Sequence, residues 1–278
     1  PSASFSMKGS LTVNGGVTFN PSGGTITMSG TGWGLSNSGT LLSFSGLTIA
    51  TTPAAQPSAS FSVKGALTVN TGAVLSPSSG TVTMENGSSI ANSGTLTFSA
   101  LTVANSATVT ASGAFTVGSG LSIGSGSTFT PSGTVTVNGD ISNAGAQTGS
   151  GTLLLSGGSS AHVLSGGGSY TNLQINDSQG ATLSSNLTVN GTLTLSTGNI
   201  TTGTNTLSIG SSGSVSRTSG HVVGNLAKNV STGSPVSRSF EIGDASNYAP
   251  ISVTFASVTT AGTLTVKTTS SDHPNIAT

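Results

Sequence analysis

Short alternating segments run along almost the whole chain, each of the form apolar, Ser or Thr, apolar. Leu11-Thr12-Val13, Leu67-Thr68-Val69 and Val135-Thr136-Val137 are examples. Alternation with a period of two residues is typical of β-strands, and the β-branched residues Thr, Val and Ile favour them. Stretches such as NGG, PSGG and GSGS separate the segments and predict tight turns. Because no stretch of the chain has the periodicity of an amphipathic helix, we expect essentially no helix.

Longer stretches of the chain repeat one another. PSASFSMKGSLTVNGG begins at residue 1 and PSASFSVKGALTVNTG at residue 57, so Leu11 aligns with Leu67. Further along, Leu47 aligns with Leu101, a slightly shorter spacing that indicates small deletions in the loops. A weaker third copy includes PSGTVTVNGDISNAG, and a fourth echo follows it. The approximate copies are 1–56, 57–110, 111–165 and 166–216.

These repeats predict an all-β fold in which successive coils of the backbone stack as a parallel β-solenoid (β-helix). Strands this short and this closely spaced do not suit a β-sandwich. A repeat of about 54–56 residues divided by three gives coils of about 18–19 residues, so that residues 1–216 form about 12 coils. Inward Leu, Val, Ile and Phe would stack on their counterparts in neighbouring coils, with Ser and Thr outside.

Residues 217–278 have a different pattern. They contain seven of the twelve charged residues of the chain and longer alternating runs at 237–242, 251–255 and 263–267. We expect a more charged, β-rich C-terminal module here, with antiparallel strands that cap the open edge of the solenoid. The seven charged residues are Arg217, Lys228, Arg238, Glu241, Asp244, Lys267 and Asp272.

The composition excludes several classes of protein. Only 4% of the 278 residues are charged and the formal net charge is zero, so the chain lacks the clustered cations of a nucleic-acid-binding protein. It has no cysteine, which excludes disulfides and thiolate metal sites. No apolar run is long enough for a transmembrane helix. The chain starts at Pro1 without a signal peptide, so we interpret it as a processed product or an excerpt of a longer protein.

No catalytic, cofactor-binding or metal-ligating residue is predicted, and we expect no cofactor and no enzymatic activity. Acid–base catalysis needs two titratable groups that converge on one bond, and Glu85, Asp140 and Asp177 lie in different repeats. Asp140 and Asp177 are about two coils apart and would share a face at roughly 10 Å, but Asp at such positions is typical of turns. The spacing of His162, His221 and His273 matches no metal-binding motif.

Other residues have a binding interpretation beside a structural one. Lys228, Arg238, Glu241 and Asp244 are the densest group of charges, either surface ion pairs or a calcium or ligand site. Trp33, the only tryptophan, either packs in the core or stacks on a sugar, and Tyr170 and Tyr248 are further aromatic candidates for a glycan site. Thr-x-Thr pairs are typical of ice-binding β-helices. Their spacing here is irregular, which disfavours that function; the pairs begin at Thr25, Thr81, Thr95, Thr108, Thr128, Thr134 and Thr192.

One segment carries a family resemblance. GHVVGNLAKNVS at 220–231 and SFEIGDASNYAPISVTFA at 239–256 resemble a module of long repetitive secreted cell-surface proteins of Bacteroidota, Chlorobi and Ignavibacteria. The part of the chain before this segment is similar in style to β-helical adhesins and autotransporter passengers. The residues that match are Gly224, Asn225, Leu226, Lys228, Phe240, Gly243, Asp244, Tyr248 and Pro250. The resemblance implies export and display at or beyond the outer membrane.

Together these observations predict an extracellular structural protein of a bacterial surface: a stalk, adhesin shaft or filament subunit. We expect copies of the chain itself as partners, through end-to-end or lateral stacking, and no nucleic acid. The alternative is an adhesin module that binds a glycan or host surface. A polysaccharide-active β-helix enzyme and an ice-binding protein are less favoured by the sequence.

Overall fold

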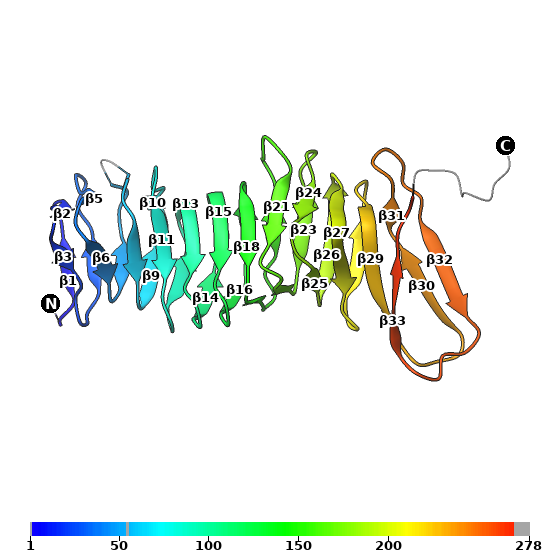
Figure 1. Cartoon of the computed structure of the whole chain (residues 1–278). Helices are drawn as coiled ribbons and strands as arrows, with labels where there is room; N and C mark the ends of the chain where they lie inside the picture. The colour runs from blue at the N-terminus through cyan, green and yellow to red at the C-terminus, as the bar shows by residue number, and fades with distance from the viewer. Residues whose placement is uncertain (1, 54–55, 270–278) are drawn as a thin grey trace. The chain divides into compact units, whose positions relative to one another are not determined.

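The computed structural model describes residues 2–53 and 56–269. These residues form β-strands and no helix (Figure 1). The predicted all-β class is therefore confirmed, and this part of the chain contains no helix that could cross a lipid bilayer. The chain divides into two compact units, Pro1–Gly158 and Ser159–Thr278.

The first unit is a parallel β-solenoid with three faces, which the chain visits in the order face 1, face 2, face 3. Face 1 contains β1 (Phe5–Met7), β4 (Ile26–Met28), β7 (Leu47–Ile49), β9 (Ala66–Val69), β12 (Ser89–Asn92), β14 (Thr108–Ser112), β16 (Thr128–Pro131) and β19 (Ala146–Gln147).

The other two faces are built in the same way, and two long strands bend from one face to the next. Face 2 contains β2 (Leu11–Val13), β5 (Leu35–Asn37), β10 (Val74–Leu75), the first halves of β13 (Thr95–Val103) and β15 (Phe115–Ile123), β17 (Val135–Val137) and β20 (Leu153–Leu155). Face 3 contains β3 (Thr18–Phe19), β6 (Leu41–Phe44), β8 (Phe61–Val63), β11 (Thr81–Met84), the second halves of β13 and β15, and β18 (Asp140–Asn143).

The alternation of apolar and Ser/Thr residues sets which side chains enter the core. In β7, Leu47 and Ile49 are buried inside the stack, and Thr48 between them points outward and is half-buried. The register places Leu47 on Leu67 in the next coil, so apolar side chains form continuous inner columns. Burying one such side chain contributes roughly 1.5–3 kcal/mol, but only neighbouring coils together exclude water from it.

Most coils of the first unit are longer than the sequence repeat predicts. Along face 1, from the pair Phe5–Ile26 to the pair Ala111–Pro131, one coil takes on average about 21 residues, against the expected value of about 18–19 residues. Shorter coils of the expected length follow, as in the step from Val135 to Leu153.

The sequence repeats and the coils therefore have different lengths. From Phe61 on face 3 to the equivalent Phe115 on face 2, the chain makes eight strand-to-strand steps, or two and two-thirds coils. Each sequence repeat starts one face away from the previous one, and repeat-equivalent residues do not stack on each other.

This arrangement is possible because all three faces make the same demand on the sequence. Each strand needs two inward apolar residues around one outward Ser or Thr, whichever face it occupies. A repeat must then contain a whole number of strands, but not a whole number of coils. The division of each repeat by three assumed that every repeat returns to the same face.

The second unit has a similar plan of parallel strands in three columns. The first column contains β21 (His162–Ser165), β24 (Ala181–Leu183), the first halves of β27 (Ile200–Ile209) and β29 (Val222–Val230), and β31 (Ile242–Gly243). The second contains β22 (Ser169–Tyr170), β25 (Leu187–Val189) and the second halves of β27 and β29. The third contains β23 (Leu173–Asn176), β26 (Thr192–Thr197) and β28 (Ser214–Arg217).

Antiparallel strands follow the parallel stack near the C-terminus. β33 (Gly262–Val266) pairs antiparallel with the second half of β29, and β30 (Val236–Phe240) forms an antiparallel pair with β32 (Ile251–Phe255). The parallel column nevertheless continues to β31, beyond residue 216. The division of the chain at 216/217 stays a prediction, and Asp272 lies outside the described residues.

Candidate functional site

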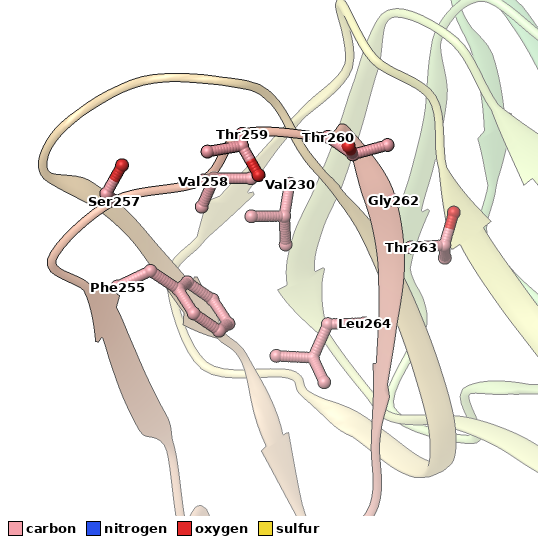
Figure 2. Close-up of a pocket in the computed structure, with 9 residues that line it drawn as sticks. All are labelled: Val230, Phe255, Ser257, Val258, Thr259, Thr260, Gly262, Thr263 and Leu264. Carbon is pink, nitrogen blue, oxygen red and sulfur yellow. The ribbon is translucent and has the colours of Figure 1, made fainter.

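Among the described residues, an apolar and a polar pocket lie beside the antiparallel strands of the second unit. The apolar pocket has a volume of about 370 Å³ and lies between β32, β33 and the end of β29. Figure 2 shows the side chains of Val230, Phe255 and Leu264 directed into this space. Phe255 and Leu264 are only half-buried, so the apolar face of these two strands is less completely covered than the core of the solenoid.

The polar pocket has a volume of about 290 Å³ and lies where the third column ends. β28 pairs with β26, the preceding strand of the third column. The strand that would come next in this column is β30, but β30 pairs with β32 instead. The gap between β28 and β30 is lined by Ser211, Ser214, Lys228, Arg238 and Glu241, among others. We call this space the β28–β30 cleft.

Three of the four charged residues predicted to group together line this cleft. Lys228 Nζ lies 2.6 Å from Glu241 Oε2, and both side chains are mostly buried. Arg238 donates from Nε to the carbonyl oxygen of Asn229 (2.7 Å) and from Nη2 to Ser231 Oγ (3.0 Å). No described carboxylate forms an ion pair with the Arg238 guanidinium, so the cleft carries one positive charge that no neighbouring acid balances.

Asp244, the fourth member of the predicted group, has a different role. Its Oδ1 accepts hydrogen bonds from the backbone N–H groups of Ser246 (2.8 Å) and Asn247 (2.7 Å), which closes the loop between β31 and β32. These backbone bonds lower the pKa of Asp244 from its ordinary value of 3.8. The four charged residues therefore form one ion pair, one backbone-bound guanidinium and one loop carboxylate.

Beside this loop, an aromatic side chain covers the end of β28. The guanidinium of Arg217 lies 3.5 Å from the centroid of the Tyr248 ring, a cation–π contact. His221 Nε2 lies 2.7 Å from the carbonyl oxygen of Asp244, so this nitrogen carries a proton and donates it. Tyr248 thus has one ring face against Arg217, which reduces the aromatic surface available to a sugar.

The other two aromatic candidates lie in the core. Trp33 is 1% exposed, and its Nε1 donates to the carbonyl oxygen of Thr51 at 3.1 Å. Tyr170 is also 1% exposed, in the second column of the second unit. The interpretation of Trp33 as a core residue is therefore confirmed, and a surface glycan site built on Trp33 or Tyr170 is wrong.

The structure contains one buried pair of titratable groups that the sequence did not reveal. His162 Nε2 lies 3.1 Å from Asp177 Oδ2, and the two side chains are 1% and 5% exposed. Asp177 Oδ1 also accepts the backbone N–H of Gln179, so the expected role of Asp177 in a turn is confirmed. The two residues are distant in the sequence and belong to no motif, so only the closing of a coil brings them together.

The remaining acidic candidates do not converge. Glu85 follows β11 and Asp140 begins β18 on the same face of the first unit, but β13 and β15 stand between these strands. At a strand spacing of about 4.8 Å, the two strands are roughly 14 Å apart. In the part of the chain that the structure describes, no three His, Cys, Asp or Glu side chains gather as metal ligands. His273 lies outside that part.

The Thr-x-Thr pairs do not form a continuous ladder. Thr108 and Thr110 stack on Thr128 and Thr130, but the next coil of face 1 offers Ala146 opposite Thr128. On the other side, a serine and not a threonine pairs with Thr110.

Comparisons of the chain with protein-family models, with curated proteins and with solved structures found no significant match.

Proposed function

We propose that this chain is an extracellular structural protein of a bacterial surface, a β-solenoid that serves as a stalk, adhesin shaft or filament subunit. The observation that supports this proposal best is the distribution of residue types between the inside and the outside of the solenoid. Inner positions hold apolar columns, outer positions hold Ser and Thr, and charged residues make up only 4% of the sequence. Such a sequence encodes a regular stacked fold and contains few titratable groups that acid–base chemistry could use, which favours a structural role.

Hydrogen bonding between coils adds to the rigidity expected of such a protein. Asn37 and Asn92 occupy equivalent places in two sequence repeats, and each amide oxygen accepts the N–H of the glycine two positions later. The amide nitrogens of the same two residues donate to carbonyl oxygens of the following coil, at Ser60 and Ala114. The corners between strands are therefore tied to neighbouring coils and do not behave as independent loops.

A matched pair of variants tests the mechanical role. Val117 is fully buried in β15, whereas its neighbour Thr116 points outward. We expect Val117→Lys to make the full chain sensitive to protease digestion, because it places a charge in the apolar column. Thr116→Lys, which adds the same charge outside, should remain resistant. Equal sensitivity of the two variants and the original protein would contradict a role that depends on the stacked core.

Electron microscopy and cell labelling test the proposed function itself. In negative stain we expect elongated particles, because a stalk, shaft or filament subunit has to span a distance. Antibodies against the purified chain should label intact cells of the producing bacterium. Round particles, or labelling only after the cells are opened, would overturn the proposal.

Self-association is the partner interaction that we propose for this role. β1 pairs with β4 on one side, and the outermost coil leaves Phe5 37% and Val17 50% exposed. A parallel strand edge with apolar neighbours can accept a further coil. Sedimentation over a range of protein concentrations should show assemblies that Val17→Lys reduces, and a strictly monomeric protein would exclude the filament while leaving the stalk.

A further inference from the structure

The β28–β30 cleft has features that a purely mechanical element does not need. A solenoid ends its columns most simply by apolar packing or by strand pairing, as β33 does against β29. Here, instead, β30 separates from β28, and the resulting space contains two cations, one carboxylate and several serine residues. In a chain that contains only 6 Lys and Arg in total, two of these cations line one small cleft.

The charges in the cleft favour an anionic ligand. Glu241 neutralises Lys228, but Arg238 has only backbone and hydroxyl oxygens as partners among the described residues. Three of the five N–H groups of the guanidinium are used in these bonds, which fix its position and leave two for a ligand. A guanidinium held in this way is suited to bind a carboxylate through its planar N–H groups.

The rest of the lining favours a ligand that also carries hydroxyl groups. Glu241 uses one of the three protons of Lys228 Nζ, so this ammonium group can still donate, and Glu241 can still accept. Ser211 and Ser214 add hydroxyls to the lining, from the corner after β27 and from β28. The volume of about 290 Å³ is just below the range typical of drug-sized ligands, which corresponds to one sugar ring.

We propose that the β28–β30 cleft binds a single carboxylated sugar unit, such as a terminal uronate of an acidic polysaccharide. Arg238 holds the carboxylate, and the Lys228–Glu241 pair and the serine hydroxyls bind the ring hydroxyls. The second unit would then present a binding site beside β28, the last strand of its third column. This proposal does not rest on the structural role, because the cleft binds the sugar in the same way whether or not the chain serves as a stalk.

The test uses the full chain and four simple probes: glucuronate and galacturonate, with glucose and galactose as neutral partners of the same shape. In ligand-observed NMR titrations we expect the uronates to bind at least tenfold more tightly than the neutral sugars. Binding should weaken as salt is added, because the contact is between charges. Equal binding of uronates and neutral sugars, or no binding of either uronate, overturns the proposal.

Variants then locate the site. Arg238→Gln should abolish uronate binding, and Arg238→Lys, which keeps the charge but loses the planar N–H groups, should weaken it several-fold. Lys267→Gln removes the same charge from an exposed position outside the cleft and should leave binding unchanged. If Lys267→Gln weakens binding as much as Arg238→Gln does, the ligand responds to net charge and the proposed site is wrong.

Two further probes separate the sugar from other anions. Inorganic phosphate and a short poly-glutamate peptide carry negative charge without ring hydroxyls. We expect both to bind at least tenfold more weakly than glucuronate. A preference for either of them would overturn the sugar assignment, the first in favour of a simple anion site and the second in favour of an acidic peptide. Circular dichroism melting of each variant shows whether a loss of binding reflects a loss of fold.

Discussion

Phe61 and Phe115 occupy equivalent positions in two sequence repeats, yet Phe61 lies on face 3 of the first unit and Phe115 on face 2. The register of the strands, and not the sequence repeat, therefore defines the unit that can be added or removed. Leu101 pairs with Leu121 in the next coil, so the segment 101–120 makes up one complete coil.

We accordingly expect deletion of 101–120 to give a folded protein with one coil fewer. Every following strand stays on its own face, so the inner columns close again across the deletion. Deletion of 101–110, half a coil, should instead move the following strands away from their partners. Thermal melting by circular dichroism compares the two, and equal melting temperatures would contradict the assigned register.

Packing in the core should be sensitive to the loss of a large side chain. Phe98 is fully buried and its ring lies 5.5 Å from that of Phe115, edge to face. Phe98→Ala should lower the free energy of unfolding by about 3–5 kcal/mol. Ile251→Ala, at a position 44% exposed, should change it by less than about 1 kcal/mol. Urea denaturation measures both, and similar values would argue against the described core.

The buried His162–Asp177 pair should stabilise the second unit. Asp177→Ala removes the carboxylate from beside His162 Nε2 and the acceptor from the N–H of Gln179. We expect a loss of about 1–3 kcal/mol, the usual cost of removing an acceptor from buried hydrogen-bonding groups. Glu85→Ala is the control, because this half-buried carboxylate has no ion pair among the described residues. If both variants lose a similar free energy of unfolding, the buried pair does not contribute the expected stability.

The loop closed by Asp244 should depend on pH in one direction. Because the backbone bonds from Ser246 and Asn247 lower the pKa of Asp244 in the folded protein, the ionised carboxylate stabilises the loop. This contribution is present above pH 3.8 and is lost as the pH falls through the lower pKa of the folded state. NMR of the Ser246 and Asn247 amides should show a transition below pH 3.8. A transition at higher pH would contradict the hydrogen bonds described.

Close stacking of the corners should make some glycines irreplaceable. Gly198 has a φ of +77°, and an added Cβ would overlap the carbonyl oxygen of Asp177 in the neighbouring coil. Gly198→Ala should therefore cost more than about 1 kcal/mol. At Gly262 an added Cβ meets no atom within 4 Å, so Gly262→Ala should be tolerated. Denaturation of the two variants provides the comparison, and a neutral Gly198→Ala would argue against the tight corner.

The sequence predicted the fold because every strand shows the same local signal. Leu67-Thr68-Val69 alternates as its burial does, with both apolar residues inside and the threonine between them half-buried. The coil length could not be derived in the same way. Strands on the three faces have the same residue pattern. The sequence therefore does not distinguish a repeat of eight strands, or two and two-thirds coils, from a repeat of nine strands, or three coils.

The candidate sites were harder to predict, because they depend on contacts between distant segments. Nothing in the sequence near Trp33 indicates that its indole N–H reaches the carbonyl oxygen of Thr51, which is half-buried. The grouping of Lys228, Arg238 and Glu241 was visible from their spacing, and the structure does bring them to one cleft. Asp244 lies in the loop between the antiparallel strands β30 and β32. The alternating runs predicted such strands, but not that the loop between them would separate Asp244 from the other three charged residues.

The one-face displacement of each repeat also affects the outer surface of the first unit. Phe5, Phe61 and Phe115 begin corresponding strands on three different sides. Any residue that occurs once per repeat thus follows a spiral path around the stack, and its repeat-equivalent copies do not pair with one another. Straight rows of hydroxyls on this surface come instead from strands that are not repeat-equivalent, such as Thr27, Thr48 and Thr68 on face 1 and Thr97, Thr116 and Thr136 on face 2.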